Sequence, residues 1–145
     1  SFTSSLRPLF ASGRIFQYPS HQEKGISLLS KYWSEIKRIW PNALDKNNFK
    51  DYVLMKTIGV FSMHLLLAEV LDIYKDPEEA IKEAYKKIKF ADQNGFDETY
   101  WFTKRNLAGE RIASGNYAAS LSSGSGHKQI VNTILSLKSK DKANG

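Results

Sequence analysis

The feature that most constrains this chain is an apolar stretch, residues 53–71, whose spacing marks it as a helix. Apolar residues recur in it at three- and four-residue intervals, and further apolar residues fill most of the remaining faces. A helix that is apolar nearly all round is enclosed by other elements. Because Lys56, His64 and Glu69 interrupt the stretch, whereas a membrane span needs about 20 nearly uncharged residues, we expect a central core helix.

Capping and helix-breaking residues predict three further helices. Ser20 with Glu23 fits a capping box, and Pro41 ends the helix that follows. The run 76–79, Asp-Pro-Glu-Glu, is a strong helix start, with Asn94-Gly95 as its end. We expect helices from Ser20 to Trp40, from about Phe49 or Lys50 to Ile73, from Pro77 to about Gln93, and from near Gly126 onwards. Gly59 inside the second of these is typical of close helix crossing.

The length and composition predict one domain. The chain has 145 residues, of which 41% are hydrophobic, values usual for a folded domain with a single core. We expect an all-α fold: one irregular domain of about four to five helices around the central apolar helix, with a long Gly/Ser-rich loop before the last helix. Residues 1–19 read as an irregular arm or linker end, 20–138 as the helical domain and 139–145 as a frayed basic tail. The opening, without Met or a signal-peptide pattern, is typical of a piece of a longer protein.

The chain has no cysteine, which excludes disulfides and thiolate chemistry and favours a cytoplasmic location. The three histidines, His21, His64 and His127, show no metal-ligand spacing, and no nucleophile-elbow motif is present. We therefore expect neither a metal nor another cofactor, and the pattern leans against an enzyme. His64, on the same side as Lys56 and Thr57, fits a polar seam in a site or a structural histidine.

An excess of 21 Lys and Arg over 15 Asp and Glu gives a net charge of +6. This balance favours an anionic partner without choosing among nucleic acid, a phosphorylated ligand and a membrane surface. Lys82, Lys86 and Lys89 form a stripe that could touch a phosphate backbone. Because Glu78–Lys82 and Glu83–Lys87 are favourable i,i+4 pairs, a solvated helix face is the alternative.

The Gly/Ser-rich segment before the last helix carries the strongest functional pattern. Glycines that expose backbone N–H groups, hydroxyls and two basic residues meet where a helix dipole favours negative charge. The spacing is not that of a P-loop, and a flexible linker has the same composition. The candidate anion site consists of Ser123, Gly124, Ser125, Gly126, His127 and Lys128.

Lys104, Arg105 and Arg111 flank this segment on its other side, beside Trp101. If they converge on the loop, the cations can hold phosphates while the indole of Trp101 stacks on a base or sugar. The alternative is that Trp101 anchors an irregular segment in the core.

The run 52–59, Tyr-Val-Leu-Met-Lys-Thr-Ile-Gly, which continues into Leu65-Leu66-Leu67, resembles the C-terminal helical part of DGQHR-domain proteins. The order of elements over residues 20–138 is also similar. These are bacterial, DndB-related proteins associated with DNA phosphorothioate modification and phage defence. The resemblance implies a cytoplasmic, DNA-linked accessory domain. The Asp-Gly-Gln-His-Arg motif itself is absent here, and no catalytic residue is carried over.

Three functional hypotheses follow from these patterns. The first is a non-catalytic domain that binds nucleic-acid phosphates through Arg105, Arg111, Lys128 and the backbone of 123–126. The second is a structural or interaction domain, in which the aromatic face of the first helix or the N-terminal arm docks on the rest of the parent protein or a second copy. The third is a small phosphorylated-ligand site at the Gly/Ser loop.

Overall fold

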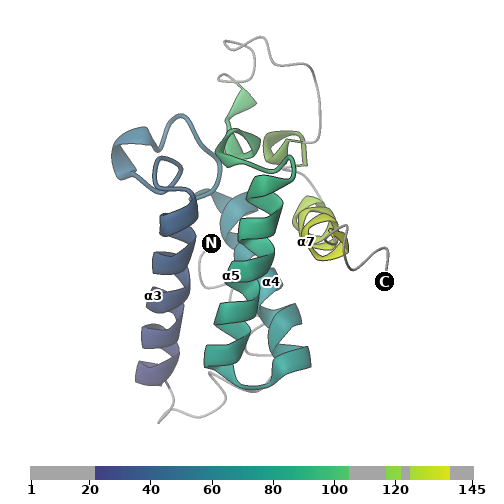
Figure 1. Cartoon of the computed structure of the whole chain (residues 1–145). Coiled ribbons are helices and arrows are strands. Elements are labelled where there is room, and N and C mark those ends of the chain that lie inside the picture. The colour runs from purple at the N-terminus through teal and green to yellow at the C-terminus, as the bar shows by residue number, and fades with distance from the viewer. Residues whose placement is uncertain (1–21, 105–116, 122–124, 138–145) are drawn as a thin grey trace.

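The computed structural model of the chain describes residues 22–104, 117–121 and 125–137 (Figure 1). These residues form α-helices and short 3-10 helices, and within them the only β-type pairing is an isolated bridge between Tyr52 and Phe102. The prediction of an all-α fold is therefore confirmed. In chain order the elements are α3 (Gln22–Ile39), η2 (Lys46–Asn48), α4 (Thr57–Tyr74), α5 (Pro77–Gln93), η3 (Glu98–Trp101), η4 (Ala118–Leu121) and α7 (Gly126–Ser136).

Helix α4 is the centre of the packing. It lies against both α5 and α7, while α3 packs on α5. In Figure 1, α3 and α5 stand side by side, and α7 is seen end-on because it runs across them. By length and composition alone α4 could cross a membrane, yet half of it is buried by the other elements of this fold. The expectation of a central core helix is confirmed.

The predicted start of this central helix was wrong. The helix begins at Thr57 rather than at Phe49 or Lys50, because the preceding backbone bonds to a distant segment. The N–H of Val53 donates to the carbonyl of Trp101 at 2.6 Å, and that of Thr103 donates to the carbonyl of Asp51 at 3.0 Å. These bonds replace the helical ones that the apolar spacing of 53–54 predicted.

Gly59 does permit a close approach, but its neighbour is not a crossing helix. A Cβ at this position would overlap the carbonyl group of Leu54, in the turn that leads into α4. The glycine therefore lets the chain fold back tightly on the first turn of the central helix.

Large side chains of α3, and of Trp40 directly after it, attach this helix to the other elements. The hydroxyl of Tyr32 donates to the carbonyl of Met63 at 2.7 Å. The indole of Trp40 packs edge-on against Trp101 at 5.5 Å between ring centroids, and its N–H donates to Asp92 at 2.9 Å. Tyr32 and Trp40 are buried by the fold itself. The aromatic face of the first helix is thus not the open docking surface that the interaction hypothesis requires.

The helix boundaries predicted from local signals agree closely with the structure. Asp76 caps α5 by accepting a hydrogen bond from the N–H of Glu79 at 3.0 Å, and Pro77 occupies the first turn. After α5 the chain turns through Gly95, whose φ of +98° suits glycine. The last helix begins at Gly126 as expected.

Candidate functional site

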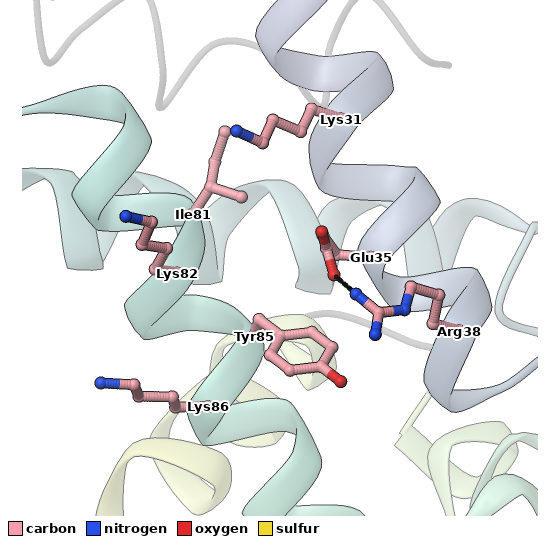
Figure 2. Close-up of a pocket in the computed structure, with 7 residues that line it drawn as sticks. All are labelled: Lys31, Glu35, Arg38, Ile81, Lys82, Tyr85 and Lys86. Atoms are coloured by element: carbon pink, nitrogen blue, oxygen red, sulfur yellow. Dashed lines mark hydrogen bonds and ion pairs between the residues drawn. The ribbon is translucent and has the colours of Figure 1, made fainter.

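A groove of about 370 Å³ lies between α3 and α5. Its floor includes the buried side chain of Ile81, and five of its seven lining residues are charged, although most of the exposed lining surface is apolar. In Figure 2, Lys31, Glu35, Arg38 and Tyr85 lie between the two helices, whereas the ends of Lys82 and Lys86 extend away from α3 at the rim. The lining residues are Lys31, Glu35 and Arg38 from α3, with Ile81, Lys82, Tyr85 and Lys86 from α5.

The groove is strongly cationic. The lining residues include four basic side chains and a single carboxylate, Glu35, which gives a formal charge of +3. Glu35 is held by Arg38 at 2.9 Å, and Lys82 lies 3.5 Å from Glu79 outside the groove. Lys31 and Lys86 form no ion pair with any residue that the structure describes. Their charges are therefore available to an anion in the groove or at its rim.

An aromatic ring lies among these cations. The guanidinium carbon of Arg38 is 5.7 Å from the centroid of Tyr85, and Nζ of Lys89 is 5.9 Å from it. Both distances are at the outer limit of cation–π contacts, about 6 Å. The arrangement combines an aromatic surface with positive charge, as sites for nucleotides and single-stranded nucleic acids do.

The helical repeat explains why these residues line one groove. Lys31, Glu35 and Arg38 are separated by four and three residues, so they share one face of α3. Lys82, Lys86 and Lys89 follow the same spacing on α5, and all three are exposed. The lysine stripe on α5 was predicted from the sequence, whereas the charged face of α3 was not. The i, i+4, i+7 run on α3 was the available signal.

The predicted ion pairs of α5 are partly corrected. The partner of Lys82 is Glu79, three residues earlier, rather than Glu78. Glu83 and Lys87 do pair as predicted, at 3.8 Å. The exposed lysines of this helix form a solvated face and, at the same time, one rim of the groove.

At the predicted anion site, the structure describes Ser125 to Lys128. Ser125 occupies the N-cap of α7, but its side chain makes no capping hydrogen bond. Gly126 is buried, and a Cβ there would overlap the carbonyl oxygen of Leu121. Close packing of η4 on α7 thus accounts for this glycine without a ligand. Lys128 is exposed on the first turn of α7.

His127 does not supply the positive charge expected of it. Its ring packs against Phe61 of α4, with centroids 5.4 Å apart. Burial, and then the nearby charge of Lys128, lower the pKa of His127 below its ordinary value. Both effects disfavour the charged form of the imidazole, so Lys128 is the main cation of the described start of α7.

The stacking role predicted for Trp101 is wrong. Its side chain is 0% exposed and lies between Trp40 and Tyr100 in the core, which leaves no open ring face for a base. Lys104 is exposed, and no hydrogen bond or ion pair among the described residues joins it to α7. Arg105, Arg111, Ser123 and Gly124 lie outside the described residues.

His64 is a structural histidine. It is fully buried in α4, and its Nε2 accepts a hydrogen bond from the indole N–H of Trp33 at 3.0 Å. Lys56, which the polar-seam interpretation placed beside it, instead lies over the ring of Phe49 at 5.3 Å. Within the described part of the chain, no group of three or more acidic or histidine side chains is arranged to hold a metal ion.

Comparisons with family models, with curated proteins and with solved structures found no match to this chain. The resemblance to DGQHR-domain proteins therefore stays a prediction that rests on the pattern of residues 52–59 and the order of elements.

Proposed function

We propose that this chain is a helical binding domain that holds the phosphates of a nucleic acid in the cationic groove between α3 and α5. The observation that carries the proposal is the meeting of basic side chains from two helices around one hollow. Lys31 and Arg38 come from α3, and Lys82 and Lys86 from α5. Positive side chains held along a groove are the common feature of phosphate-backbone binding.

The nature of the groove favours binding over catalysis. Its one carboxylate, Glu35, is paired with Arg38 at 2.9 Å, so that group positions a cation rather than acting as a base. The remaining charged groups of the lining are lysines, which hold anions as point charges. This proposal keeps the predicted ligand class but moves the main contact surface from the Gly/Ser loop to α3 and α5.

The wider role remains a proposal that follows from the resemblance alone. In it, the domain belongs to a longer, cytoplasmic, bacterial protein linked to DNA modification or defence, and the rest of that protein is a further partner. The groove supports only the DNA-linked part of this role, through its charge.

The test is a binding titration of fluorescently labelled 20-nucleotide single-stranded and duplex DNA at 50 and 200 mM salt. We expect binding that weakens steeply with salt, because each phosphate contact releases counterions. The double variant Lys31→Gln/Lys86→Gln removes one groove cation from each helix. It should lower the slope of log K against log salt by about 1.4 to 1.8 if both lysines contact phosphates.

The matched control is Lys46→Gln/Lys50→Gln, which removes the same charge from exposed positions outside the groove. It should change binding much less than the groove variant. A second comparison, Lys104→Gln/Lys128→Gln, measures the contribution of the surface predicted from the sequence. Absence of binding at 50 mM salt overturns the proposed function, and equal losses in groove and control variants overturn its placement.

A further inference from the structure

The ring of Tyr85 is the one aromatic surface in the lining of the groove. In Figure 2 it extends from α5 toward α3, close to the paired side chains of Glu35 and Arg38. Tyr85 is half-buried, unlike the fully buried aromatic rings of the core. Tyr85 is therefore not one of the rings that form the hydrophobic core, and it lies in the lining of the groove.

The contacts of Tyr85 are ones that a ligand can displace. Arg38 and Lys89 lie 5.7 and 5.9 Å from the ring centroid, too far for tight stacking. The side chain of Arg38 is 68% exposed, so its guanidinium can move to a phosphate with little loss of packing. A flat aromatic ligand can then occupy the ring face that these cations now share.

The size of the groove limits what can enter. Its volume of about 370 Å³ is at the small end of ligand pockets, about 300 to 1,000 Å³. The seven residue-to-residue steps from Lys31 to Arg38, and from Lys82 to Lys89, each span about 10 Å of helix. The site therefore has room for one nucleotide-sized group and a short length of backbone. A base that is paired and stacked inside a duplex cannot reach the ring.

Resting on the proposed function, we propose that the groove selects single-stranded nucleic acid, with Tyr85 stacking on one unpaired base. Lys31 and Arg38 hold the phosphates on either side of that base, and the exposed Lys86 contacts the strand at the rim of the groove. Base–aromatic stacking is largely independent of sequence because every base has a π face. The site thus distinguishes unpaired from paired strands rather than one base from another.

The experiment measures the affinity of the whole chain for a single-stranded oligonucleotide, the same strand with abasic sites, and a duplex. Tyr85→Phe keeps the ring, whereas Tyr85→Leu keeps apolar cover without a π face. We expect Tyr85→Phe to bind within about twofold of the wild type. Tyr85→Leu should bind the single strand about tenfold more weakly and leave duplex and abasic binding unchanged.

A measurement on the wild type keeps the proposal testable if Tyr85→Leu does not fold. Its Tyr85 ring protons should shift in NMR spectra when the single strand is added, and not with the abasic strand. Unchanged ring protons, or equal losses of Tyr85→Leu on all three ligands, overturn the stacking proposal. If Lys31→Gln/Lys86→Gln still weakens binding in that case, the proposed function stands. If the wild type binds none of the ligands, both proposals fall.

Discussion

The indole N–H of Trp33 donates a hydrogen bond to Nε2 of His64 across 3.0 Å, which joins α3 to the middle of α4. The two rings meet edge-on, with 5.6 Å between their centroids. A ring nitrogen that accepts a hydrogen bond carries no proton, so His64 is neutral with its proton on Nδ1. Because this histidine is fully buried, the contact between the two helices depends on an uncharged imidazole.

Replacing His64 should therefore destabilise the fold. We expect His64→Ala to lower the free energy of unfolding by about 2 to 4 kcal/mol, because it leaves a cavity and removes a hydrogen-bond acceptor. His64→Gln is the control, since its amide oxygen can take the place of Nε2 and should limit the loss. Urea denaturation at pH 7.5 measures both. A cost below about 0.5 kcal/mol for the alanine variant would contradict this role.

His127 gives stability an acid dependence. Burial, and then the charge of Lys128, lower the pKa of this histidine in the folded chain. In the unfolded chain it takes up a proton near the ordinary histidine value of about 6.5. The unfolded state thus binds more protons between pH 7.5 and 5.5, and stability should fall as pH falls. In His127→Gln, urea denaturation at the two pH values should differ less than in the wild type, and an unchanged difference would refute the assignment.

Gly126 should tolerate no side chain. Its substitution by alanine places a Cβ on the carbonyl oxygen of Leu121, so we expect Gly126→Ala to cost about 2 to 3 kcal/mol. Ser125→Ala is the matched control one residue earlier. Because the Ser125 side chain makes no capping hydrogen bond, its loss should change stability by less than about 0.5 kcal/mol.

Thermal and urea unfolding of both variants measure this difference. The result also bears on the Gly/Ser loop, since a large cost at Gly126 without any ligand assigns this glycine to packing. Equal, small effects for the two substitutions would show that the glycine has no packing role. They would favour the predicted anion site at the start of α7.

Stability should also fall at alkaline pH because of Tyr32. Burial raises the pKa of Tyr32 far above its ordinary value and that of Tyr100 to about 12. An unfolded tyrosine loses its proton near pH 10, whereas the folded ones keep theirs, so the folded state binds more protons. Stability is therefore complete below about pH 10 and is lost as pH rises through that value.

Tyr32→Phe tests this dependence. At pH 7 it should cost about 1 kcal/mol, because the hydrogen bond to the carbonyl of Met63 is lost. At pH 10.5 the gap to the wild type should narrow, since the variant no longer has this proton to retain. Denaturation at the two pH values gives the comparison, and a gap that stays constant would show that Tyr32 ionises as easily in the folded state.

The helix boundaries show which parts of the fold local chemistry decides. Asp76 and Pro77 start α5 through bonds within one turn, so their positions alone predict the helix. The start of α4 was missed because Val53 bonds to Trp101, nearly fifty residues further along the chain. The spacing of apolar residues cannot predict a hydrogen bond to such a distant partner.

The candidate site divides in the same way. By itself the sequence determined the helical class, the apolar character of α4 and the lysine stripe on α5, since each depends on residues within a few turns. Only the tertiary structure decided that charged residues of α3 and α5 line one groove, that Tyr85 lies in it and that Trp101 is buried. These outcomes depend on which helix faces pack together, and side chains far apart in the sequence fix that choice.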